Sequence, residues 1–97
     1  MNKFKLKCGW TVYQCTSDET ALIGGYGICD DCNDFARIGY LVPVLNHYMC
    51  PLCFLDWSRR CKFYSSDVDF ERHSIRYYES IIPVNLDLSK VLNPNQG

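Results

Sequence analysis

The chain has 97 residues, of which 47% are hydrophobic and 14% aromatic, so it is not a disordered polymer and is long enough for one small folded domain. Its ten basic and eleven acidic residues leave a formal charge of −1, so no global positive field favours binding to nucleic acid. No apolar run approaches the roughly 20 residues of a membrane span, and the alternating N-terminal stretch is unlike a secretion signal. We therefore expect no membrane partner.

The number of cysteines indicates the redox setting. Seven is an odd number, so a complete intramolecular set of disulfides is impossible. Free thiols and metal-bound thiolates are typical of a reducing compartment, and we predict a cytoplasmic protein.

The first half of the chain predicts strands and turns. Residues 4–12, FKLKCGWTV, alternate apolar and polar side chains, which predicts one half-buried strand. The polar stretch 16–20 predicts a loop. Glycines in 24–27 predict a tight bend, since glycine readily adopts positive φ. Residues 36–46, ARIGYLVPVLN, predict two short strands of a hairpin, with Pro43 at an edge or in a turn.

The second half predicts two helices. Apolar side chains at helical spacing predict a first helix that begins at Pro51, which suits the first turn, and reaches Tyr64. A second helix is predicted over residues 65–82, with Ser66 as its cap and Pro83 as its stop.

The end of the chain completes the predicted domain. Residues 84–88, VNLDL, alternate again and predict a last strand. We predict a single zinc-stabilised domain over residues 1–92, followed by a flexible C-terminal tail over residues 93–97.

Two Cys-x-x-Cys pairs carry the most specific signal in the sequence. Seventeen residues separate the pairs, which matches the Cys-x₂-Cys-x₁₅₋₂₀-Cys-x₂-Cys pattern of zinc modules. Four thiolates close the tetrahedral shell of Zn²⁺, so we predict one structural zinc ion and no catalytic one. The loaded chain then carries a charge of about −3. The predicted ligands are Cys29, Cys32, Cys50 and Cys53, and His47 is an alternative to one of them.

The order of turn, hairpin and helix around these cysteines resembles a treble-clef zinc finger, a zinc-ribbon-like Cys₄ module. The resemblance covers residues 24–64, under half of the chain. It implies a scaffold that serves nucleic acids, ubiquitin-like proteins and other partners, and it implies no single function. The predicted fold class is α+β: a small treble-clef-like zinc-binding domain with an N-terminal strand, a β-hairpin and two helices.

Three cysteines stand outside the pairs. Cys8, Cys15 and Cys61 are predicted to be small core hydrophobes, as free cysteines often are. A second zinc site formed by these three with His73 is an alternative, although their spacing carries no ligand signature.

The chain lacks recognisable catalytic motifs, so we expect no enzyme. We predict a binding module, either an adapter or an inhibitor, that docks on a protein or nucleoprotein through apolar residues such as Leu45 and Leu55. One alternative is an RNA- or DNA-binding zinc finger, and another is a thiol-disulfide oxidoreductase. The basic residues that would contact nucleic acid are Arg59, Arg60, Lys62, Arg72 and Arg76.

Overall fold

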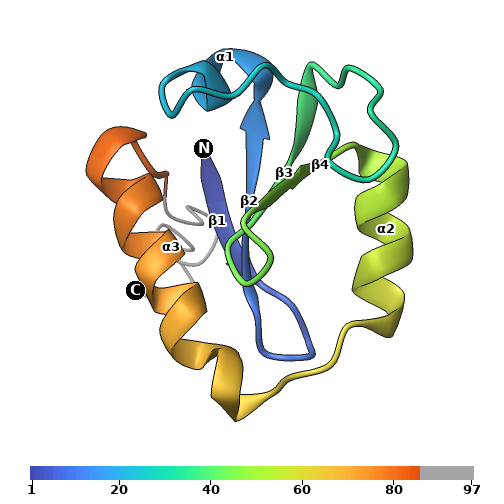
Figure 1. Cartoon of the computed structure of the whole chain (residues 1–97), viewed down its shortest axis with the longest axis vertical. Helices are drawn as coiled ribbons and strands as arrows, with labels where there is room; N and C mark the ends of the chain where they lie inside the picture. The colour runs from blue at the N-terminus through green and yellow to red at the C-terminus, as the bar shows by residue number, and fades with distance from the viewer. Residues whose placement is uncertain (86–97) are drawn as a thin grey trace, which may run out of the picture.

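A computed structural model describes residues 1–85 of the chain, and the predicted α+β class is confirmed (Figure 1). Four antiparallel strands form one sheet in the order β1-β2-β3-β4. The strands are β1 Asn2–Lys5, β2 Thr11–Thr16, β3 Ile38–Val42 and β4 His47–Met49. The helices are α1 Ser17–Ala21, α2 Pro51–Arg60 and α3 Val68–Ile81, and a 3₁₀ turn, η1 Ser65–Asp67, precedes α3. None of these helices is long and apolar enough to cross a membrane.

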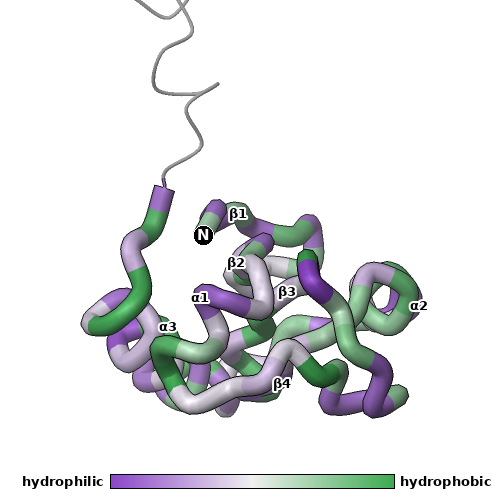
Figure 2. The backbone as a smooth tube through the Cα atoms, turned by 90° about the horizontal axis from the view of Figure 1, so that it is seen from above, coloured by the Kyte–Doolittle hydropathy of each residue, from purple (hydrophilic) through white to green (hydrophobic). Residues whose placement is uncertain are grey.

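The sheet lies between α2 and α3, as two perpendicular views show (Figures 1 and 2). Side chains alternate between the faces of a strand, so β2 supplies both cores. Tyr13 packs with Tyr78 and other residues on the α3 face, whereas Val12 packs with Phe54 on the α2 face. Strand β2 is buried on both faces for this reason. The domain therefore has three layers: α3, the sheet and α2.

Two carboxylates hold α3 to the sheet. Glu71 accepts a hydrogen bond of 2.7 Å from the backbone N–H of Thr11, the first residue of β2. Glu79 accepts one from the hydroxyl of Tyr13 and forms an ion pair of 2.7 Å with Lys3. Burial raises the pKa of Glu79, but Lys3 and Tyr13 outweigh this effect and lower it. The sequence places Glu79 on the polar face of the helix, but its side chain contacts the sheet and helps to attach α3 to it.

The single strand predicted over residues 4–12 is wrong, because the chain reverses within it. Gly9 has φ of 111°, and the N–H of Leu6 donates to the carbonyl of Trp10 at 2.9 Å. The turn separates β1 from β2, which pair with each other. Alternation continues through this short turn, so periodicity alone does not reveal it.

The loop predicted over residues 16–20 is also wrong, because it contains α1. Thr16 and Glu19 form a capping box, in which each side chain accepts a hydrogen bond from the other residue's N–H. The pattern Thr-x-x-Glu is the sequence signature of this cap and could have revealed the helix.

Both predicted helices are present, but their ends differ from the prediction. Helix α2 ends at Arg60, four residues before Tyr64, because Cys61 and Lys62 make tertiary contacts instead. Ser66 does not cap α3; it lies within η1, and Asp67 precedes the helix. The stop before Pro83 is confirmed, since Ile81 is the last helical residue.

A hairpin between the two cysteine pairs is present as β3 and β4, but its second strand lies outside the predicted range of residues 36–46. Its second strand begins at His47, so residues 43–46 form the turn, and Pro43 lies there as expected. Of the strand predicted over residues 84–88, only Asn85 is seen in a bridge, to Asn2; residues 86–88 lie outside the described part of the chain. So does the tail predicted over residues 93–97.

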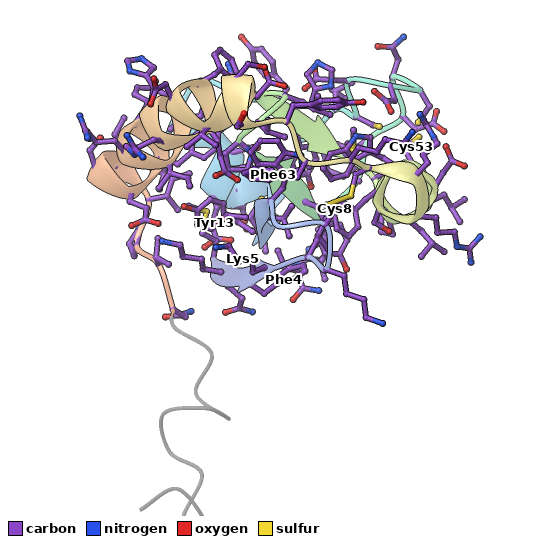
Figure 3. The ribbon with its side chains drawn as sticks, turned by 90° about the horizontal axis from the view of Figure 1, so that it is seen from below. Phe4, Lys5, Cys8, Tyr13, Cys53 and Phe63 are labelled. Atoms are coloured by element: carbon purple, nitrogen blue, oxygen red, sulfur yellow. A yellow bond between two sulfur atoms is a disulfide. The ribbon has the colours of Figure 1, made fainter. Side chains whose placement is uncertain are left out.

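The prediction that Cys8 and Cys61 are separate core residues is wrong, because they form a disulfide (Figure 3). The bond links the β1–β2 turn to the residue after α2. Cys15 is buried and free, which confirms its predicted core position. The disulfide uses two of the thiols that the alternative second zinc site requires. The cytoplasmic setting stays a prediction.

We expect the disulfide to contribute strongly to stability. It closes a loop between residues 53 positions apart, for which the chain-entropy model gives about 4 kcal/mol. The Cys8→Ser, Cys61→Ser double variant should therefore unfold at a markedly lower temperature than the oxidised protein in a thermal melt. Alkylation of the denatured, chelated and unreduced wild type should modify five cysteines. Modification of all seven would contradict the disulfide.

Candidate metal centre

The first cysteine pair lies in a tight turn, which we call the knuckle (residues 27–35). Its ends pair through an isolated bridge between Ile28 and Phe35. Inside it, the N–H of Cys29 donates to the carbonyl of Asp34 at 2.8 Å. Gly27 has φ of 72°, and a Cβ there would lie 2.5 Å from that of Ser17, so only glycine fits. The bend predicted from the glycines is thus found at the start of the knuckle.

The second pair begins α2. Cys50 is the N-cap of the helix, and its Sγ accepts a hydrogen bond of 3.5 Å from the N–H of Cys53. Pro51 occupies the first turn, where its missing N–H costs no hydrogen bond. The positive end of the helix dipole favours thiolate at this position, and the first turn contains no acidic side chain.

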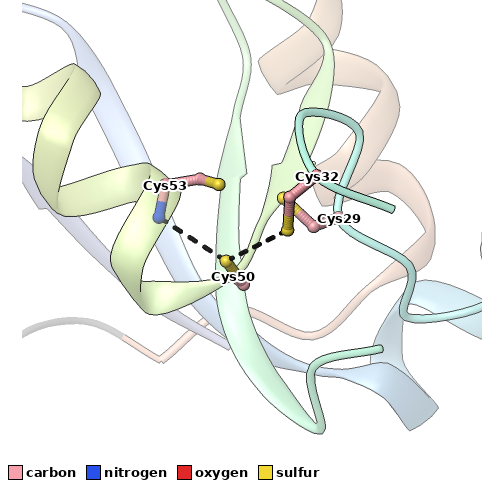
Figure 4. A group of neighbouring side chains, drawn as sticks. All are labelled: Cys29, Cys32, Cys50 and Cys53. Carbon is pink, nitrogen blue, oxygen red and sulfur yellow. Dashed lines mark hydrogen bonds between the residues drawn. The ribbon is translucent and has the colours of Figure 1, made fainter. Parts of the chain in front are cut away.

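The fold brings all four predicted ligands together (Figure 4). Their sulfur atoms lie within 4.8 Å of one another, and those of Cys32 and Cys50 are 3.7 Å apart. Two sulfurs bound to one zinc ion at about 2.3 Å in a tetrahedron are separated by roughly 3.8 Å. The four sulfurs therefore fit a tetrahedral zinc ion and would supply all four of its ligands.

Charge repulsion gives the cluster a reason to bind a cation. Burial raises the pKa of Cys29, but hydrogen bonds from backbone N–H groups, that of Cys50 foremost, outweigh burial and lower it to about 7. The pKa of Cys53 is raised, first by its side-chain hydrogen bond with Cys50 and then by burial. One thiolate forms readily, and its charge opposes the next. A divalent cation removes this conflict, because it attracts all four thiolates.

Asp30 makes a contact with β4 that is not predicted from the sequence. Its carboxylate accepts a hydrogen bond of 2.8 Å from the N–H of Tyr48, and its own N–H donates to the carbonyl of Tyr48 at 2.8 Å. These two bonds fix the knuckle to β4. No local pattern signals the contact, because the two residues lie eighteen positions apart.

His47 does not take the place of a cysteine in the cluster. It begins β4, and its Nδ1 lies 3.7 Å from the carboxylate of Asp31, a knuckle residue. The four-sulfur ligand set predicted from spacing is the one that the described residues bring together.

The predicted binding residues separate into two groups. Leu45, Arg60 and Lys62 line one groove beside the end of α2. Leu55 is 46% exposed, so it is available to a partner, whereas Leu45 is half-buried against the α2-face core. The remaining predicted basic residues are exposed and do not line that groove; they are Arg59, Arg72 and Arg76.

Comparisons of the chain with protein-family models, with curated proteins and with solved structures gave no match.

We predict one zinc ion per chain by elemental analysis of the purified protein. Structural zinc contributes roughly 10–16 kcal/mol in small zinc fingers, which is as much as the whole stability of a small domain. The Cys32→Ser, Cys53→Ser double variant should therefore lose both zinc and its folded circular dichroism spectrum. Cys15→Ala, which removes a thiol outside the cluster, should keep its zinc. A folded, metal-free double variant would contradict the zinc centre.

A second prediction concerns Asp30. Asp30→Ala removes the acceptor for the N–H of Tyr48 and should destabilise the protein by about 1 kcal/mol, measured by denaturant unfolding. Asp34→Ala is the matched control, because Asp34 serves Cys29 through its backbone carbonyl. Equal effects of the two substitutions would show that Asp30 has no special role.

Proposed function

We propose that the chain is a non-enzymatic, zinc-stabilised binding module that docks on a protein or nucleoprotein partner as an adapter or inhibitor. The observation that carries this proposal is the pairing of a closed sulfur cluster with an exposed apolar side chain beside it. Leu52 lies between the ligands Cys50 and Cys53 and is 79% exposed. The zinc then shapes a contact surface and performs no chemistry.

The sulfur cluster supports a structural role for the metal. A catalytic zinc keeps a position for water or substrate, whereas four cysteines occupy the whole tetrahedral shell. Helix α2 begins at the cluster, so metal binding fixes the helix that presents Leu52. The resemblance to treble-clef modules is consistent with this use, since such modules serve as binding scaffolds.

Further apolar side chains near the cluster support a protein partner. Leu55 lies one turn after Leu52 on α2, and both are exposed. Ile28 and Phe35, which close the knuckle, are also exposed. The buried centre of a protein interface is more apolar than the rest of the surface, so exposed apolar side chains close to one another favour a protein partner. A protein partner that contacts these side chains is the most direct explanation of their exposure.

A comparison of baits tests the proposal. Zinc-loaded wild type should retain a stoichiometric protein partner in a pull-down that includes nuclease, and Leu52→Asp should lose it because a charge would be buried in the contact. Tyr26→Asp, at a position that is 83% exposed, is the control for a new surface charge. Partners that are retained equally by all three baits would argue against docking at α2.

The oxidoreductase alternative makes a different prediction. A redox-active Cys29 would react rapidly with iodoacetamide in purified protein that contains no zinc. A zinc-bound Cys29 should react slowly until the metal is removed by a chelator. Mass spectrometry of the alkylated peptide separates these two outcomes.

A further inference from the structure

We propose that the groove at the end of α2 binds a nucleotide unit of single-stranded nucleic acid. This site lies at the opposite end of α2 from the metal cluster and goes beyond the proposed function. The groove has a volume of about 410 Å³. The residues that characterise its chemistry are Trp10, Trp57, Arg60, Lys62, Tyr64 and Asp67.

The aromatic side chains offer the groove rings for stacking. Trp57 lines it and is half-buried, whereas Trp10 is only 2% exposed and belongs to its buried wall. Tyr64, which also lines it, is 55% exposed, so its ring is not needed to fill the core. Every nucleobase has a flat face that can stack on such a ring without a requirement for sequence.

The charged side chains narrow the class of ligand. Arg60 and Lys62 would repel a cationic ligand such as a methylated lysine. A wholly apolar ligand would remove these two side chains and Asp67 from water without giving them partners. An acidic peptide would satisfy the cations but leave the aromatic rings without a stacking partner. A nucleotide satisfies both requirements, because its phosphate attracts the cations and its base stacks.

The acidic residues near the groove are compatible with this ligand. Asp56 lies 3.1 Å from Arg60, but both side chains are well exposed, and such pairs are weak in water. Arg60 can therefore exchange this carboxylate for a phosphate. Asp67 can accept a hydrogen bond from the exocyclic amine of a base or from a ribose hydroxyl.

The wall of the groove is fixed before any ligand arrives. Cys61 lines the groove and is held by its disulfide to Cys8. The indole N–H of Trp10 donates to the carbonyl of Lys62 at 2.8 Å. The ring of Phe63 packs on that of Trp10 with 4.5 Å between their centroids. The segment between α2 and η1 thus has a defined path without being helical, and a preformed site loses less entropy on binding.

The test uses the zinc-loaded, oxidised protein and a fluorescein-labelled oligouridylate of about eight nucleotides. Binding should raise the anisotropy of the label and quench the intrinsic fluorescence, since Trp57 lines the groove. Tyr64→Ala should weaken binding roughly 5- to 150-fold, the loss expected for one stacked base. Arg60→Ala and Lys62→Ala should each reduce the slope of log K against log salt by roughly 0.7.

Matched controls separate this site from a general effect of surface rings or charge. Tyr26→Ala and Arg72→Ala change exposed residues outside the groove lining and should bind like wild type. Leu52→Asp should also keep its oligouridylate affinity, so failure of the protein-docking proposal is distinguishable from failure of this one.

Several results would overturn the inference. No binding at about 50 mM salt would do so. Equal losses in Tyr64→Ala and Tyr26→Ala, or equal competition by polyglutamate, would replace the stacking site with a non-specific contact. Quenching by uridine monophosphate without binding of the oligouridylate would identify a free nucleotide as the ligand instead of a strand.

Discussion

The close approach of four cysteine sulfurs is the constraint on which the rest of the structure depends. The four ligands come from two distant segments, the knuckle and the start of α2, and only a shared cation lets all of them be thiolates. Cys29 is buried in the same core as Val12 and Phe54, so the metal centre is continuous with the hydrophobic packing on the α2 face. Metal binding at this cluster would therefore be coupled to the packing on the α2 face.

The other end of α2 is held by different chemistry. Cys61, directly after the helix, is bonded to Cys8 of the β1–β2 turn. A three-layer arrangement is demanding for so short a chain, because each helix buries only one stripe of side chains and a small domain buries a smaller share of its surface than a large one. The disulfide offsets part of this shortage and holds the C-terminal end of the helix that our two proposed binding surfaces share. A metal ion bound at the cysteine cluster would hold the other end of the same helix.

The cysteine cluster could be predicted because its signal is local. Two short pairs at a characteristic spacing suffice, and the helix start at Pro51 carries its own cue. The features that sequence reasoning missed depend on contacts between distant residues. Two examples are the hydrogen bonds from Tyr48 to Asp30 and from Tyr13 to Glu79. Neither produces a repeating pattern in the sequence.

Two further errors have distinct causes. The sequence did carry the capping signature of α1 in Thr16 and Glu19, but the polar character of the segment favoured a loop. The pairing of Cys8 with Cys61 has no such signature, because it follows from the β1–β2 reversal at Gly9. An alternating pattern read as one strand places Cys8 on a sheet face, whereas a hairpin places it in a turn that can reach α2.

The coexistence of metal ligands and a disulfide bears on the order of events during maturation. In an unfolded chain, oxidation could join any two of the seven thiols, and most of the products would be incompatible with this fold. Once a metal ion holds the four clustered sulfurs, three thiols remain. Burial then shields Cys15, which leaves Cys8 and Cys61 as the single accessible couple. Metal uptake before oxidation would thus direct disulfide formation to Cys8 and Cys61 and prevent incorrect pairings.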